Sequence, residues 1–186
     1  MNVYDFDKTI FYPDSSAAFF RFCLKRYPSA FLRVAPQIIG YSLLYVFRVI
    51  RMKPLKEKLF SFLHYLPEPQ DAVNAFWQGN FAGIGSWYLA QKKDDDLIIS
   101  ASPVFLVGAA AEKLGVHLIG TRMDIRSGKI SGENCHDEEK VRRFYEAYPG
   151  GEIDSFYSDS LSDTPLASIA KHAFLVKKGK LSIWPN

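Results

Sequence analysis

Cysteine is scarce in this chain, which has only two among 186 residues, Cys23 and Cys135. Neither belongs to a CxxC pair, so the sequence lacks the spacing of a zinc knuckle or a thiol redox motif. Two free thiols are compatible with a reducing compartment. The opening residues, MNVYDFD, also lack the apolar run of a signal peptide. These absences predict a cytoplasmic protein.

Long hydrophobic runs are absent as well. The longest apolar stretch covers residues 34–47 and is interrupted by Pro36, Gln37 and Gly40. Because a bilayer span needs about 20 apolar residues, we expect no transmembrane helix. The sequence also contains no internal repeat and no low-complexity tract.

Apolar residues are nevertheless plentiful, with 48% hydrophobic and 15% aromatic residues, which is enough for a packed core. The net charge of +3 is unevenly distributed, because residues 15–60 contain nine Lys or Arg and a single acid, Glu57. Such a basic region favours an anionic substrate or surface. No recognisable nucleic-acid-binding motif accompanies it, so we expect no nucleic acid partner.

The apolar pattern divides the chain into two kinds of structure. A short strand at the N-terminus precedes a block that is helical throughout, and strands alternate with helices from about residue 97 onward. This alternation predicts an α/β fold, a Rossmann-like doubly wound parallel sheet covered on both faces. We expect a core of residues 1–13 and 90–186 with an inserted all-helical cap, 14–89. The helices expected in the cap are 15–27, 30–50, 53–65 and 69–80.

The expected helix 30–50 is apolar around most of its circumference. The favoured interpretation is burial within a four-helix cap, since helices that are apolar on all sides are usually buried. The alternative is an interfacial helix in peripheral contact with the inner face of a membrane. Arg33, Arg48, Arg51 and Lys53 flank the helix and would then contact anionic lipid.

Two carboxylates follow the first expected strand. Asp5 and Asp7 lie two residues apart, so extended chain places them on the same side, at the end of a strand where α/β sheets bind ligands. Two anions this close require a cation between them or a shared proton. The alternative is an Asp-rich surface turn.

Matching polar residues occur near the ends of later strands. Ser100 ends the run LIIS, Lys140 lies in a later helix, and Asp159 and Asp163 belong to the loop after IDSFY. Each has an ordinary structural explanation: a turn residue, a solvated helix face or a helix cap. Together they form an acidic, hydroxyl and lysine set in a fixed order, which points to one shared site.

These segments resemble the four motifs of the haloacid dehalogenase superfamily, in its phosphoserine-phosphatase-like subclass. All four motifs occur in order over nearly the whole chain, and the expected cap lies between the first and second motifs, as in that subclass. The resemblance implies a magnesium-dependent phosphatase that hydrolyses a phosphate monoester.

The resemblance implies roles for the first two motifs. Asp5 would attack phosphorus and become a phospho-aspartate, and Asp7 would protonate the leaving oxygen and then deprotonate water. Ser100 would hydrogen-bond a phosphoryl oxygen, assisted by nearby backbone N–H groups, and we count Thr9 and Ala101 with it as phosphate-binding residues.

The resemblance also implies a charge-balancing set. Lys140 would neutralise charge on the nucleophile and the phosphoryl group. Mg²⁺ would be held by the carboxylates of Asp5 and Asp159 and by the backbone carbonyl of Asp7. Asp163 would support this arrangement. Magnesium suits the set because it prefers oxygen ligands and retains waters.

The substrate stays open between a small phosphorylated metabolite and an anionic lipid head group. Asp14 lies nine residues after the nucleophile, where phosphoserine phosphatases have an acidic residue, although a helix N-cap is the favoured interpretation of Asp14. Their Ser-Gly-Gly motif is replaced here by Ser100-Ala101-Ser102-Pro103. That segment, with those around Lys140 and Asp159, resembles bacterial phosphatidylglycerophosphate phosphatases.

Two alternative functions remain at this stage. A phosphotransferase would use the same phospho-aspartate but pass the group to an alcohol, since acceptor choice depends on cap shape and water access. A non-catalytic module would bind a divalent metal without turnover. The proton-transferring position of Asp7 argues against the second.

Overall fold

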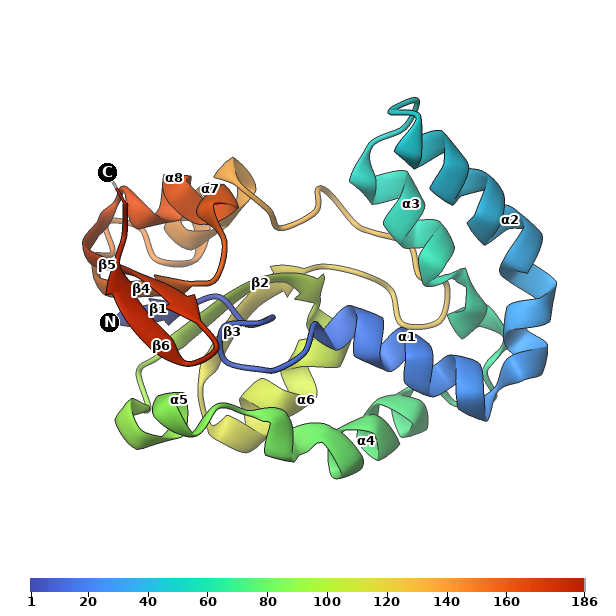
Figure 1. Cartoon of the computed structure of the whole chain (residues 1–186), viewed down its shortest axis with the longest axis horizontal. Coiled ribbons are helices and arrows are strands. Elements are labelled where there is room, and N and C mark those ends of the chain that lie inside the picture. The colour runs from blue at the N-terminus through green and yellow to red at the C-terminus, as the bar shows by residue number, and fades with distance from the viewer. Residues whose placement is uncertain (186) are drawn as a thin grey trace.

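The residues that the structure describes form a six-stranded sheet. The computed structural model describes residues 1–185, and Figure 1 shows the chain. The strand order is β3-β2-β1-β4-β5-β6, and every neighbouring pair is parallel except the antiparallel pair β5–β6. The strands are β1 (Asn2–Tyr4), β2 (Leu97–Pro103), β3 (His117–Thr121), β4 (Ile153–Ser158), β5 (Ala170–Lys177) and β6 (Lys180–Ile183).

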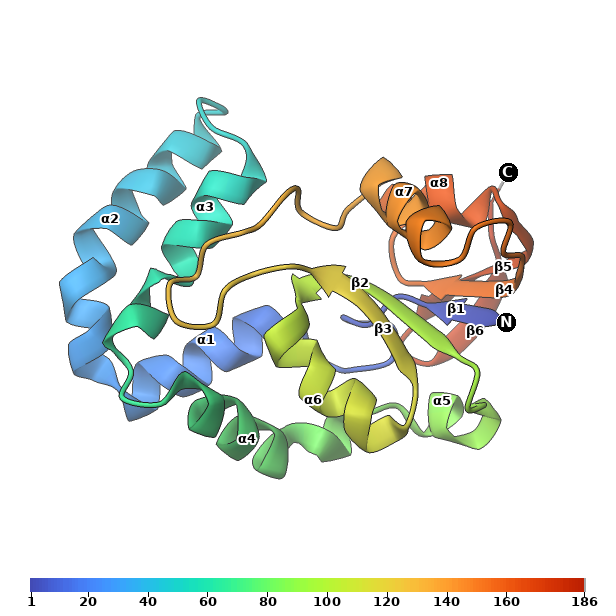
Figure 2. The same cartoon turned by 180° about the vertical axis from the view of Figure 1, so that it is seen from behind.

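Apolar layers cover both faces of this sheet. Side chains alternate along a strand, so Val3 and Tyr4 of β1 point into opposite layers. Helix α6 (Val104–Leu114) covers one face, and α7 (Glu138–Ala147) and α8 (Thr164–Ala167) cover the other (Figures 1 and 2). The prediction of an α/β, Rossmann-like doubly wound parallel sheet is therefore confirmed.

Within the described residues, five α-helices lie between β1 and β2 in chain order. They are α1 (Ser15–Arg26), α2 (Pro28–Val46), α3 (Met52–Leu59), α4 (Pro69–Asn80) and α5 (Ser86–Gln91). The first, second and fourth correspond to expected helices. The expected helix 53–65 divides into α3 and a 3-10 helix, Ser61–Tyr65. The sequence pattern does not predict α5.

Helices α1 to α3 form a projecting helical lobe, residues 15–59, whereas α4 lies against α6 (Figure 1). An aromatic cluster fixes α4 there. The Trp77 ring packs edge-on against Phe11 and Phe76, each at a centroid distance of 5.0 Å. Its indole Nε1 donates a 2.7 Å hydrogen bond to the Leu106 carbonyl of α6. Helix α4 is therefore attached to α6 through a buried contact.

The two chain segments that connect the helices to the sheet lie side by side. The Tyr12 amide donates to the Gly83 carbonyl at 3.0 Å, and the Gly85 amide donates to the Ile10 carbonyl at 2.7 Å. A Cβ atom on Gly83 would lie 2.8 Å from the Tyr12 carbonyl oxygen, so glycine permits this close pairing. The chain thus leaves the sheet and returns to it at one place.

Helix α2 departs from the favoured expectation of burial. Only Ala30, Phe31 and Val34 are buried, and every residue of 35–50 is at least partly exposed. The reason is that α3 and the 3-10 helix pack along one side of α2, while its other sides face solvent at the edge of the molecule (Figure 1). Among the described residues, no helix combines the length and apolar character needed to cross a membrane.

Candidate active site

Loops at the carboxyl ends of three neighbouring strands form the candidate site. The acidic pair Asp5 and Asp7 follows β1, the pair Ser100 and Ala101 lies near the end of β2, and loop 158–163 begins at the end of β4. Because β1 lies between β2 and β4, these loops meet at one edge of the sheet. This is where open α/β sheets bind their ligands.

A buried lysine joins two of the acidic residues. Lys140 Nζ lies 2.7 Å from Asp5 Oδ1 and 2.8 Å from a carboxylate oxygen of Asp163. Ser158 Oγ donates a further 2.7 Å hydrogen bond to Asp163. Burial disfavours the charge on Lys140, but the two carboxylates outweigh it and raise the pKa of the ammonium group. The lysine is therefore a fixed cation beside Asp5.

The hydroxyl of Thr9 connects the first and last loops. Thr9 Oγ1 donates to Asp5 Oδ2 at 3.3 Å and accepts from the Asp159 amide at 2.8 Å. Burial raises the pKa of Asp5 despite Lys140, and burial also raises that of Asp159. Asp5 and Asp163 thus contact Lys140, and Thr9 joins Asp5 to the loop that carries Asp159. Carboxylate oxygens are ligands that suit a hard divalent cation.

The carboxylate of Asp7 accepts hydrogen bonds from the first residue of α1 and from the end of β2. Asp7 Oδ1 accepts from the Ser15 amide at 2.6 Å, and Asp7 Oδ2 accepts from Ser102 Oγ at 2.5 Å. Asp14 caps the same helix, α1, because its Oδ1 accepts from the Ala17 amide at 2.9 Å. The N-cap interpretation of Asp14 is therefore confirmed. Ser102 is absent from the predicted set, although it directly follows Ser100 and Ala101.

The two predicted phosphate-binding residues of β2 are tied into the same network. The Ser100 hydroxyl is fully buried and accepts from the Ser102 amide at 3.0 Å. The Ala101 carbonyl accepts from Thr121 Oγ1 at 2.6 Å and also from Lys56 Nζ. These bonds fix the backbone at the end of the strand, where it faces the helical lobe.

Lys56 of α3 is a site residue that the sequence does not predict. Its Nζ donates to the Ala101 carbonyl and, at 2.9 Å, to Asn134 Oδ1. Burial lowers the pKa of Lys56 to about 8. Its membership of the basic region is the only signal in the sequence, because nothing local shows which of those lysines turns inward. The lobe thus contributes a cation to the site.

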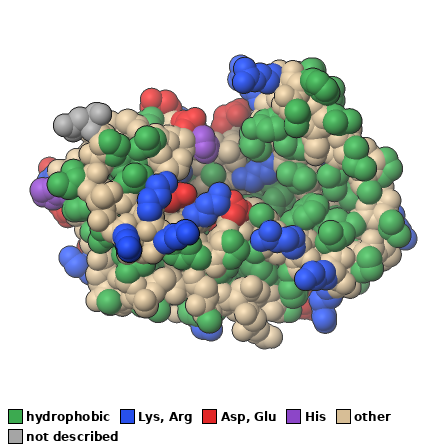
Figure 3. Space-filling model, in the orientation of Figure 1, with side chains coloured by type: hydrophobic (Ala, Val, Ile, Leu, Met, Phe, Trp, Pro, Cys, Tyr) green, Lys and Arg blue, Asp and Glu red, His purple; other side chains and the backbone are tan. Residues whose placement is uncertain are grey.

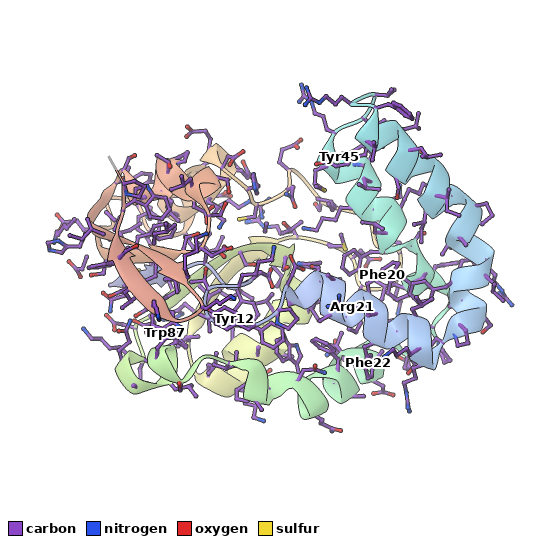
Figure 4. All side chains as sticks on the ribbon, in the orientation of Figure 1. Tyr12, Phe20, Arg21, Phe22, Tyr45 and Trp87 are labelled. Atoms are coloured by element: carbon purple, nitrogen blue, oxygen red, sulfur yellow. The ribbon has the colours of Figure 1, made fainter. Side chains whose placement is uncertain are left out.

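A cleft of about 590 Å³ lies between the helical lobe and the end of β2. The hollow between these parts is visible in Figure 3. One end is polar and is lined by Asp7, Asp14, Lys56, Ser102 and Asn134. The opposite wall is apolar and is lined by Ala17, Phe20, Tyr45, Met52, Leu59 and Phe60. Figure 4 shows Tyr45 near the tip of the lobe and Phe20 near its base.

A doubly wound sheet with an acidic pair after its first strand, a buried lysine and a late acidic loop defines a Rossmann-like hydrolase. A family model described as haloacid dehalogenase-like hydrolase matches residues 3–168. The chain belongs to this family. It is a hydrolase of the phosphatase class.

Three proteins illustrate what this chain is similar to. Protein CicA of Caulobacter vibrioides is 29% identical over 196 residues, covering 95% of this chain and 86% of CicA. The crystal structure of a protein of unknown function from Bordetella pertussis Tohama I has a TM-score of 0.71 and 23% identity, covering 93% and 87% of the two chains. A substrate-bound phosphoserine phosphatase complex has a TM-score of 0.59 and 13% identity, covering 92% and 82%. These two structures share the fold.

Proposed function

We propose that this protein is a magnesium-dependent phosphomonoester hydrolase that acts through a phospho-aspartate intermediate on Asp5. One observation carries the proposal. Lys140 Nζ joins Asp5 to Asp163 in a buried ion network. A second acid, Asp7, follows Asp5 by two residues in sequence and lines the cleft. A nucleophile, a fixed cation and a second acid in this arrangement meet the needs of phosphoryl transfer.

The reaction follows from the two acids. An oxygen of Asp5 attacks the phosphorus, and the bond between phosphorus and the leaving oxygen breaks as Asp7 donates a proton to that oxygen. Water then attacks the phosphorus while Asp7 accepts its proton. The bond between phosphorus and the Asp5 oxygen breaks, which releases inorganic phosphate and restores the Asp5 carboxylate. The hydrogen bonds from Ser15 and Ser102 support this role because they orient the Asp7 carboxylate toward the cleft.

The remaining predicted residues bind and balance charge. Ser100 and the Ala101 backbone contact phosphoryl oxygens from the end of β2, and Thr9 holds the loop of the nucleophile. Lys140 offsets the negative charge that gathers on the equatorial oxygens. Asp163 acts through Lys140, which it positions.

Three groups would hold Mg²⁺: the carboxylates of Asp5 and Asp159 and the backbone carbonyl of Asp7. The Thr9 hydroxyl supports the assignment, because it bonds both the Asp5 carboxylate and the Asp159 amide and so holds the two loops together. When bound, the ion would supply positive charge to the phosphoryl oxygens. Within residues 1–185, no cluster of three or more His, Cys, Asp or Glu side chains is arranged to hold an ion. Backbone and water ligands, which Mg²⁺ accepts readily, would complete the shell.

The substrate is a phosphorylated compound of the cytoplasm or its membrane surface, either a small metabolite or an anionic lipid head group such as that of phosphatidylglycerophosphate. The apolar wall of the cleft, with Phe20, Tyr45 and Phe60, supports a leaving group with apolar parts. The polar end, with Lys56 and Asn134, supports an anionic or hydroxylated portion next to the phosphate.

The test is phosphate release by the Asp5→Asn variant, with Asp95→Asn on an exposed loop as the matched control. We expect Asp5→Asn to abolish turnover of p-nitrophenyl phosphate, Asp95→Asn to retain it, and removal of Mg²⁺ by a chelator to suppress it reversibly. Thermal unfolding of both variants checks that the fold persists. Full activity in Asp5→Asn would end the proposal. A screen of soluble phosphomonoesters and phosphatidylglycerophosphate, with and without glycerol as acceptor, then separates substrates and distinguishes hydrolysis from phosphotransfer.

A further inference from the structure

Exposed large apolar side chains are concentrated on one part of the molecule. Nine of the seventeen that the structure records lie between residues 32 and 52, and Leu32 and Phe47 are 77% and 75% exposed. Figure 3 shows the resulting apolar surface over the helical lobe. We call this the apolar face: Leu32, Ile39, Leu43, Leu44, Tyr45, Val46, Phe47, Val49 and Met52. A surface of this kind marks an interaction site.

The charged residues within the segment 32–53 have one sign. Arg33, Arg48 and Arg51 are exposed beside it, and residues 15–56 contain no acid. The nearest acid in the chain, Glu57, is already engaged, because its carboxylate contacts Lys129 at 3.2 Å and accepts from the Ile130 amide. Cations therefore border the apolar side chains without local compensation.

The turn between α2 and α3 combines both features in one segment. It reads Phe47-Arg48-Val49-Ile50-Arg51, so three apolar side chains are interspersed with two arginines. Phe47 and Val49 are 75% and 67% exposed, and the turn lies at the outer tip of the lobe (Figure 1). Arg48 has a φ of 58°, a backbone conformation that non-glycine residues adopt rarely. The turn therefore presents apolar side chains at an outer tip of the lobe.

We propose that the apolar face docks onto an anionic lipid bilayer, with the turn 47–51 inserted among the head groups. Apolar side chains flanked by arginines match an interface that is apolar below and negatively charged above. Since no described helix is suited to crossing a membrane, α2 lies in the plane of the interface. A symmetric pair of copies fits less well, because it would bring the arginines Arg33, Arg48 and Arg51 of both copies together.

The apolar face and the cleft share two residues. Tyr45 and Met52 are partly exposed and also line the apolar wall of the cleft. Figure 4 shows Tyr45 on this part of the lobe. Docking therefore brings the cleft to the lipid surface, so that a phosphorylated amphiphile enters with its tail still among lipids. This consequence depends on the proposed function, whereas the docking itself does not.

The test is co-sedimentation of the full chain with vesicles of phosphatidylglycerol and phosphatidylcholine, compared with phosphatidylcholine alone. We expect binding to the anionic vesicles at low salt and weaker binding at high salt, because screening shortens the reach of the arginines. Phe47→Ser with Val49→Ser should weaken partitioning about tenfold or more. Arg48→Gln with Arg51→Gln should weaken it by about fivefold per arginine.

The matched control is Leu181→Ser with Ile183→Ser, which removes two exposed apolar side chains from β6 at the opposite end of the molecule (Figure 1). This control should bind as the unchanged protein does. The Phe47 and Val49 variant should also keep the unchanged turnover of p-nitrophenyl phosphate. Asp5→Asn should keep full vesicle binding, so a failure of catalysis is separable from a failure of docking.

Two outcomes would overturn the docking proposal. The first is a protein that stays in the supernatant with anionic vesicles at low salt, or a β6 control variant that loses as much binding as Phe47→Ser with Val49→Ser does. The second is self-association in sedimentation velocity that is abolished by Phe47→Ser with Val49→Ser, in a chain that does not bind vesicles. The second outcome would assign the face to another copy of this chain.

Discussion

Lys56 Nζ donates a hydrogen bond to the Ala101 carbonyl, so a side chain of the helical lobe reaches the end of strand β2. The same ammonium group donates to Asn134 Oδ1, which lies on the loop between β3 and α7. One cation therefore holds three separate segments around the polar end of the cleft. A bound anion would compete for that cation, which gives Lys56 a role in substrate binding.

Replacing Lys56 tests that role. Lys56→Met should lower kcat/KM for p-nitrophenyl phosphate by about 10- to 100-fold, since a hydrogen bond from a charged group contributes about 1.5–3 kcal/mol. The loss should be larger in KM than in kcat, because the residue binds instead of reacting. Lys53→Met, at a neighbouring lysine outside the cleft lining, is the control. Equal kcat/KM in Lys56→Met and the unchanged protein would reduce Lys56 to a structural role.

The pH dependence of the reaction should report the same lysine. Burial lowers the pKa of Lys56 to about 8, so its ammonium group loses its proton as the pH rises through that value. We therefore expect kcat/KM to fall on the alkaline side near pH 8. Lys56→Arg keeps its charge in that range and should move the alkaline limb upward. A limb that stays in place in Lys56→Arg would show that another group controls it.

The buried lysine beside Asp5 should matter for stability as well as for activity. Lys140→Met leaves Asp5 and Asp163 buried without their cation, and breaking a buried ion pair in this way costs about 3–5 kcal/mol. The midpoint of urea unfolding should fall accordingly. Lys171→Met, on an exposed lysine paired with Asp154, should leave the midpoint nearly unchanged. Similar urea midpoints for the two variants would contradict a stabilising role for the ion pairs of Lys140.

Two tryptophans provide a matched pair for the contact between α4 and α6. The Trp77 indole donates to Leu106, whereas the buried Trp87 indole has no hydrogen-bond partner among the described residues. Trp77→Phe should destabilise the protein by about 1–3 kcal/mol, because the Leu106 carbonyl loses its donor. Trp87→Phe, near Tyr12 in Figure 4, should cost less. Calorimetric unfolding distinguishes the two, and a larger loss for Trp87→Phe would refute the assignment.

The order of strand ends made part of the site predictable. Asp5 and Asp163 follow β1 and β4, whose carboxyl ends meet at one edge of the sheet, and Lys140 of α7 contacts both side chains. Lys56 and Asn134 could not be found in this way. Their positions depend on how the helical lobe packs against the sheet, and no local pattern encodes that packing.

The burial of α2 was predicted wrongly for a related reason. Apolar periodicity identifies side chains that gain from burial, but whether Leu43 or Phe47 is buried depends on a neighbouring element long enough to cover it. Helix α3 ends at Leu59 after 8 residues, whereas α2 has 19. The failure to predict α5 from the sequence has a simpler cause, because a helix of 6 residues is too short to show a helical period.

The paired backbone at Ile10, Tyr12, Gly83 and Gly85 has a consequence for how such enzymes diversify. Both ends of the intervening stretch are fastened at one spot, so its length can change without shifting any strand of the sheet. Helices of another length, which would form a different wall of the cleft, can replace the present ones at this junction while Asp5 and Asp7 keep their positions. The chemistry and the choice of substrate are thereby free to evolve as separate modules.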